Sequence, residues 1–87
     1  MYYLIVYDVT VEKVNKLHRF LKKYMNWIQN SVFEGEIGDA DIITIKKYIK
    51  EKIDSETDSV LLFSVRDKKY LDKEVIGRER NSTERLI

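Results

Sequence analysis

Met1–Asp8, with the sequence M-Y-Y-L-I-V-Y-D, is the stretch that decides the fold. Successive side chains of a strand point to opposite faces, and both faces of this stretch are apolar. One face would carry Tyr3, Ile5 and Tyr7, and the other Tyr2, Leu4 and Val6. The pattern predicts a central strand that is covered on both sides. The strand ends on a carboxylate, Asp8, which is either a local cap or a functional group.

The length and composition of the chain predict one small domain. With 87 residues the chain leaves much of its surface unburied, so a second copy would be a natural way to complete a core. It has no Cys, which excludes disulfides and thiolate metal sites and suits a reducing cytosol. We find neither an apolar run of about 20 residues nor a basic leader before the first strand, and therefore expect a soluble, cytoplasmic protein.

A basic amphipathic helix is predicted from Thr10, as N-cap, to about Met25. Its buried stripe would be Val14, Leu17, Leu21 and Met25. Its outer side and flanks carry Lys13, Lys16, Arg19, Lys22 and Lys23, with Glu12 as the single acid. Most charge runs on helices are solvated faces, but five cations could also neutralise several phosphates of a duplex. Since the net charge is only +1, any binding of nucleic acid must come from this local distribution.

The rest of the chain completes a βαββαβ pattern. Strands are expected at Trp27–Gln29 and Val32–Ile37, joined by a turn at Asn30 and Ser31, and a strand follows at Asp58–Val65. Between them lies a helix from about Ala40 to Ile53, whose inner face would be Ile42, Ile45, Ile49 and Ile53. Right-handed crossovers then give a ferredoxin-like α+β sandwich with sheet order 4-1-3-2.

This order places the apolar strand Asp58–Val65 at an exposed edge, where it could pair with another chain. A fifth strand is predicted at Lys73–Gly77, which carries Val75 and Ile76. If it crosses to a partner and pairs beside that partner's fourth strand, an isologous homodimer results. The ferredoxin-like domain would then span residues 1–77, and residues 78–87 would form a tail that docks partners.

Several chemistries find little support in the sequence. His18 is the single histidine and is expected to be a partly packed imidazole beside the apolar stripe. Neither GxxxxGK[ST] nor GxGxxG is present, so phosphate cradles are unsupported. The acids Glu34, Glu36, Asp39 and Asp41 lie where helix N-termini attract negative charge, and we interpret them as a solvated rim.

Asp8 has two interpretations. Across a dimer axis, two copies of Asp8 could hold a Mg²⁺ that keeps most of its waters and activates one for phosphodiester attack. Alternatively, Asp8 accepts backbone N–H bonds where the first helix begins. Composition and spacing alone favour the second, structural role.

Several motifs in order along nearly the whole chain resemble one family. They are Y-L-I-V-Y-D-V, then the basic helix, Q-N-S-V-F-E-G-E-I, D-S-V-L-L-F-S-V and the closing E-V-I-G. Together they resemble the small CRISPR adaptation protein, the non-integrase member of the pair that captures spacers. The combination of the Q-x-S-V-F-x-G element with the N-terminal Y-D strand is what makes the resemblance specific.

The resemblance implies a ferredoxin-like homodimer with an exchanged C-terminal strand. It also implies that the dimer bridges two dimers of the CRISPR integrase and lies under double-stranded DNA awaiting insertion into the array. A metal-dependent endonuclease activity on RNA or DNA is implied as well, with Mg²⁺ or another hard divalent cation at Asp8. The resemblance also implies that Tyr7, Ser31 and Phe33 correspond to family positions implicated in that site.

The chain departs from this family at the start of the first helix. Many relatives have a second acid and an arginine pair there, and another basic residue just before the hairpin glutamine. This chain has Thr10, Val11, Lys13, Asn15 and Lys16 in the first region and Trp27 near the second. Fewer guanidinium groups would give weaker stabilisation of charge on a reacting phosphate.

Three hypotheses follow for the function. The first is a DNA-bridging dimer of the CRISPR adaptation machinery. The second is a self-sufficient RNA- or DNA-cleaving nuclease, resembling a toxin, that depends on Asp8. The third is a ferredoxin-like regulatory dimer with a small ligand, for which no Gly-rich loop offers support. The tail discriminates between the first two, because a scaffold needs residues 78–87 for its partners whereas a nuclease could lose them.

Overall fold

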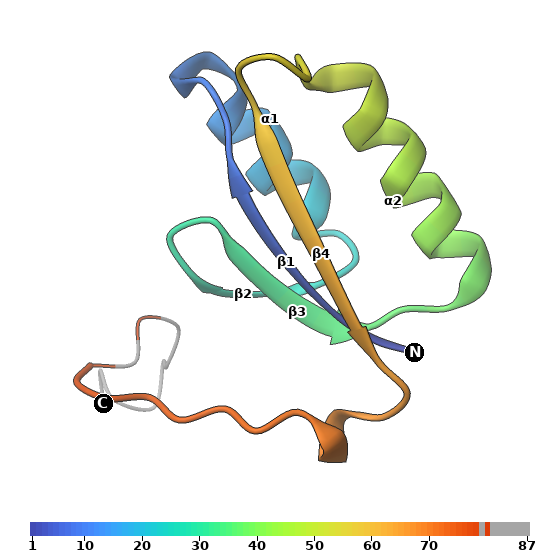
Figure 1. Cartoon of the computed structure of the whole chain (residues 1–87), viewed down its shortest axis with the longest axis vertical. Coiled ribbons are helices and arrows are strands. Elements are labelled where there is room, and N and C mark those ends of the chain that lie inside the picture. Colours follow the sequence, from blue (N-terminus) through green and yellow to red (C-terminus); the bar gives the residue numbers. More distant parts are fainter. Residues whose placement is uncertain (79, 81–87) are drawn as a thin grey trace.

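The computed structural model describes residues 1–78 and residue 80. Its elements in chain order are β1 (Tyr2–Asp8), α1 (Val11–Leu21), β2 (Asn26–Gln29), β3 (Val32–Glu36), α2 (Asp39–Lys52), β4 (Ser59–Val65) and a 3₁₀ turn, η1 (Lys68–Tyr70). The four strands form one antiparallel sheet in the order β2-β3-β1-β4 (Figure 1). This confirms the predicted α+β class and the order 4-1-3-2. Neither helix of the described part is long and apolar enough to cross a membrane.

The hydrophobic core lies between one face of the sheet and the two helices. Ile5 and Phe33 from the sheet, Leu17 and Leu21 from α1 and Ile45 from α2 are almost completely buried. Ile42 and Ile49 are also buried, which confirms most of the predicted inner face of α2. Because these side chains interlock the two layers, the ends of β1 and β4 are held in a fixed position beside the start of α1.

Helix α1 ends at Leu21 rather than at Met25. The N–H of Tyr24 bonds to the Leu21 carbonyl at 2.9 Å, so the last turn is tightened in the 3₁₀ manner. The chain can then turn into β2, where Met25 lies against Gly35. A Cβ on that glycine would be 3.4 Å from the Met25 Cα. The prediction of a longer helix was wrong because this close approach of two backbones ends the helix early.

The second face of the sheet is not covered by helices in a single chain. Register pairs Leu4 with Phe63 and Val6 with Leu61, so these side chains share one surface. Leu61 and Phe63 are 51% and 53% exposed. Val32 of β3, opposite Val6, extends the same surface. We call these five residues the open face. The predicted burial of β1 and β4 on both sides is therefore not achieved within one subunit.

The chain after β4 runs away from the helices and past the sheet (Figure 1). The Lys68 ammonium lies 5.9 Å from the ring centroid of Tyr2, and the Lys73 Nζ donates to the Glu34 Oε2 at 2.8 Å. Within this subunit, the described residues 73–77 form no strand. Their exchange with a partner stays a prediction, and the proposed docking tail, residues 78–87, lies largely outside the described residues.

Candidate functional site

Asp8 is an exposed carboxylate at the end of β1. It lies opposite Ser59 of β4, and strand alternation puts it on the same side of the sheet as Val6 and Leu4. Within residues 1–78 and 80 its carboxylate makes no hydrogen bond or ion pair. The backbone bonds proposed for it at the start of the first helix are therefore absent from the described structure.

Asp58 takes that structural role instead. One carboxylate oxygen accepts the Thr10 N–H at 3.1 Å, and the other accepts the Asp54 N–H at 2.8 Å and the Lys13 ammonium. The Asp54 N–H, then Lys13 and the Thr10 N–H lower the pKa of Asp58 to about 2, against the opposing effect of burial. Thr10 is the N-cap residue of α1, as predicted, but its hydroxyl makes no capping bond. Sequence reasoning missed the role of Asp58, although an acid directly before an apolar strand was a usable signal.

Tyr7, Ser31 and Phe33 come together, but on the helix-covered side of the sheet. The Tyr7 N–H donates to the Ser31 carbonyl at 3.1 Å, and the rings of Tyr7 and Phe33 stack with centroids 6.3 Å apart. Both rings are buried. Burial raises the pKa of the Tyr7 phenol, and the Ser31 hydroxyl partly opposes that rise. Within the described residues, the buried Tyr7 hydroxyl has no hydrogen bond of regular geometry.

The four predicted catalytic residues are thus divided between two faces of the sheet. Asp8 is exposed beside the open face, whereas the two aromatic rings lie behind it in the core and support the end of β1. One subunit offers a divalent cation a single free carboxylate here, and the described residues hold no group of three potential ligands. Carboxylate oxygen suits a hard cation such as Mg²⁺, but a second copy of Asp8 would be needed to complete the pair.

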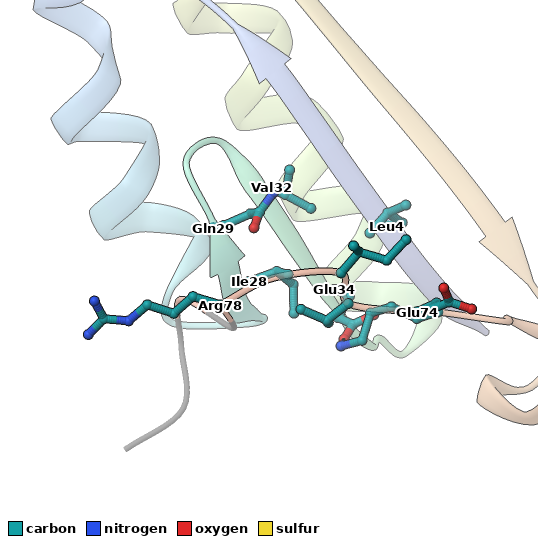
Figure 2. Close-up of a pocket in the computed structure, with 10 residues that line it drawn as sticks. Leu4, Ile28, Gln29, Val32, Glu34, Glu74 and Arg78 are labelled. Atoms are coloured by element: carbon teal, nitrogen blue, oxygen red, sulfur yellow. The ribbon is translucent and has the colours of Figure 1, made fainter. Parts of the chain in front are cut away.

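The cluster of acids beside the hairpin is more structural than the predicted solvated rim. Glu34 is buried on the open side of the sheet and bonds to Lys73, while Glu36 accepts from the Met1 amine at 2.7 Å. Figure 2 shows Leu4, Ile28 and Val32 on the sheet side of the cavity of about 360 Å³ left under residues 73–78. Asp39 and Asp41 are exposed in the first turn of α2, as predicted.

The basic residues predicted to bind nucleic acid differ in their availability. Lys16, Arg19, Lys22 and Lys23 are exposed, and none makes an ion pair within residues 1–78 and 80. Lys13 is engaged with Asp58. His18 packs edge-on against the rings of Trp27 and Phe33, with centroids 5.9 and 5.2 Å away. The helix and the turn that follows it therefore present four cations that are free of ion pairs within the described residues.

Comparison with known proteins identifies the family. The sequence profile described as CRISPR associated protein Cas2 matches residues 1–73, which include every strand and helix of the sandwich. The chain belongs to the Cas2 family. It is 49% identical over 87 residues to the "CRISPR-associated endoribonuclease Cas2" of Methanosarcina acetivorans, covering all of both chains. The protein of the same name from Pyrococcus furiosus is 45% identical, again over the full length of both.

Solved structures agree with this assignment. A structure described as "Crystal structure of cas2" superposes with a TM-score of 0.86 and 41% identity, covering 95% of this chain and 93% of the other. The resemblance drawn from the motifs of β1, β3 and β4 is thereby confirmed. Membership of the Cas2 family gives the chain a CRISPR-associated role.

Proposed function

We propose that the chain works in CRISPR adaptation as a homodimer that binds double-stranded DNA and bridges dimers of the integrase. The observation that carries this proposal is the set of four exposed cations without an ion pair among the described residues, Lys16 and Arg19 on α1 and Lys22 and Lys23 in the turn that follows it. They lie on the side of the molecule opposite the open face. Two copies that pair through their open faces would leave both basic helices exposed on the outside of the dimer.

Dimerisation is supported by what a single subunit leaves uncovered. Leu61 and Phe63 are about half exposed, and β4 is the edge strand of the sheet. An apolar sheet face and an unpaired edge on the same side of a small domain are the features that a second copy would cover. The exchange of residues 73–77 would add a strand at that edge.

Reversal of the charges on α1 tests the binding of DNA. Contacts between cations and phosphates release counterions. The logarithm of the binding constant therefore falls by about 0.9 per contact for each tenfold rise in salt concentration. We expect Lys16→Glu, Arg19→Glu and Lys23→Glu together to weaken binding to a duplex and to flatten its salt dependence. An unchanged slope, with the fold intact by circular dichroism, would mean that α1 does not carry the duplex.

Bridging of the integrase is proposed from family membership and from the tail. Removal of residues 78–87 should abolish co-sedimentation with the integrase while leaving duplex binding by α1 in place. If the truncated chain still joined the integrase complex, another surface would have to make the bridge.

A second candidate function is phosphodiester hydrolysis that depends on Mg²⁺ or another hard divalent cation. It is favoured by Asp8, whose carboxylate is free because Asp58 holds the start of α1, and by the endoribonuclease names of the relatives. We propose that Asp8 from two subunits would hold the ion, which when bound would activate water and offset charge on the phosphate. Tyr7 and Phe33 would fix the strand end from behind, and the Ser31 backbone would anchor it.

The nuclease proposal is tested by titrating magnesium with Asp8→Asn, using Asp72→Asn as a matched control at another exposed aspartate. We expect Asp8→Asn to lose metal-dependent cleavage of RNA and DNA by at least about a hundredfold, as for loss of a group that acts in the transition state. The control should cleave like the unaltered chain. Equal cleavage by all three proteins would assign the activity to a contaminant or to another site.

A further inference from the structure

A groove runs between the two helices on the side of the molecule opposite the open face. It has a volume of about 310 Å³ and is lined by Glu12, Lys13, Lys16, Leu17, Tyr48 and Lys52. The rings of Phe20 and Tyr48 stack beside it with centroids 3.7 Å apart and an angle of 4° between their planes. This contact joins α1 to α2, so cations on the two helices belong to one surface.

Positive charge faces the groove from both helices. Lys16 comes from α1 and Lys52 from α2, and neither makes an ion pair within the described residues. The Lys52 ammonium lies 5.6 Å from the ring centroid of Tyr48. Lys13 is already neutralised by Asp58, and Glu12 is the one acid among the described residues that line the groove. The two ammonium groups repel each other across the groove, whereas an anion bound between them would be attracted by both.

Helix α2 carries further cations: Lys47 lies on its outer side, whereas Lys46 and Lys50 also line a hollow against Val60 and Leu62 of β4, on the flank away from α1. Lys46, Lys47 and Lys50 are exposed and have no ion pair within residues 1–78 and 80, while Glu51 is the acid nearest to them in sequence. Sequence analysis assigned nucleic-acid contacts to the first helix alone, because the packing of α2 beside it was not visible. Ile43 is the one large apolar side chain that α2 exposes, which is too little to insert into a lipid surface.

We propose that the surface for duplex DNA spans both helices, with one backbone phosphate seated in the groove between Lys16 and Lys52. Lys47, on the outer side of α2, contacts a further phosphate of the same strand. This inference rests on the proposed binding of DNA and names the residues of α2 that extend it. Contacts of this kind hold a duplex by its backbone without reading its sequence.

The test compares the salt dependence of duplex binding among glutamine variants. Lys47→Gln should lower the slope by about 0.9, the value for one phosphate contact. The matched control is Lys69→Gln, on the segment that follows β4, and it should keep the slope of the unaltered chain. A slope that is the same in both variants would overturn the role of α2.

The shared phosphate is tested by a double-mutant cycle at the groove. If Lys16 and Lys52 hold one phosphate, Lys16→Gln with Lys52→Gln should lower the slope by about 0.9, and the second substitution should add less than the first. A fully additive fall of about 1.8 in the slope would mean that Lys16 and Lys52 contact two separate phosphates. That result would overturn the proposed phosphate site in the groove. If the unaltered chain binds no duplex, the proposed function fails too. If binding depends on Lys16, Arg19 and Lys23 but not on α2, only this inference fails.

Discussion

The Lys13 ammonium donates a hydrogen bond to the Asp58 carboxylate, which ties the first turn of α1 to the residue that precedes β4. The same carboxylate accepts the N–H groups of Thr10 and Asp54. One buried acid therefore joins the start of α1 to the turn between α2 and β4, which is more than 40 residues away in sequence. Because Asp58 accepts these bonds, the carboxylate of Asp8, at the neighbouring end of β1, has no hydrogen bond or ion pair to the described residues.

Replacing Asp58 should destabilise the fold more than replacing its partner. In Asp58→Asn, the amide NH₂ would face N–H donors, so buried donors would lose their acceptor. In Lys13→Met, the two backbone bonds to Asp58 would remain. We expect thermal denaturation to show a larger fall in Tm for Asp58→Asn than for Lys13→Met, and almost none for the exposed control Asp72→Asn. The reverse order would show that the ion pair outweighs the backbone bonds.

The lowered pKa of Asp58 predicts a loss of stability in acid. Its pKa falls from 3.8 to about 2 in the folded state, so between these values the unfolded chain binds the proton more readily. The contribution of Asp58 to stability is therefore complete above about pH 4 and is lost as the pH falls towards about 2. The difference in free energy of unfolding between the unaltered chain and Asp58→Asn should shrink over this range. A constant difference would contradict the assignment.

The open face should control association. Leu61→Ser with Phe63→Ser removes apolar surface that a second copy would bury. Because both subunits carry the substitutions, the dimer loses this buried surface twice. We expect the dimer to dissociate at least about tenfold more readily, measured by light scattering over a concentration series. Ile43→Ser removes a similarly exposed side chain from α2 and should leave the mass unchanged. If Ile43→Ser were the variant that dissociated, the interface would lie on the helices.

The ion pair between Glu34 and Lys73 should hold the C-terminal segment on the sheet. Glu34 is buried whereas Lys73 is partly exposed, so Lys73→Met would leave a buried carboxylate without this partner. Amide hydrogen exchange in residues 71–78 should accelerate several-fold, while Lys69→Met, on η1, should leave it unchanged. Equal exchange rates in the two variants would show that other contacts hold the segment.

Much of the fold could be predicted from the sequence because local patterns and topology rules agree. The two apolar faces of β1 and the isoleucines of α2 predict the layers, and right-handed crossovers predict the sheet order. The end of α1 could not be predicted, because the approach of Met25 to Gly35 is a contact between distant residues. The roles of Asp58 and Glu34 were hidden for the same reason. A carboxylate in a sequence does not reveal which N–H group or lysine will reach it after folding.

The candidate site was predicted in part. Asp8 is exposed at the end of a strand, as a functional carboxylate would need to be, whereas Tyr7 and Phe33 are buried on the opposite side. The cations of α2 were overlooked because their relation to α1 depends on the stacking of Phe20 on Tyr48.

The most direct test of the account is the molar mass of the complex with a short duplex, measured by analytical ultracentrifugation at low salt. The account predicts one duplex carrying two chains of 10.4 kDa each. A complex with a single chain on each duplex, or no complex at all, would contradict it.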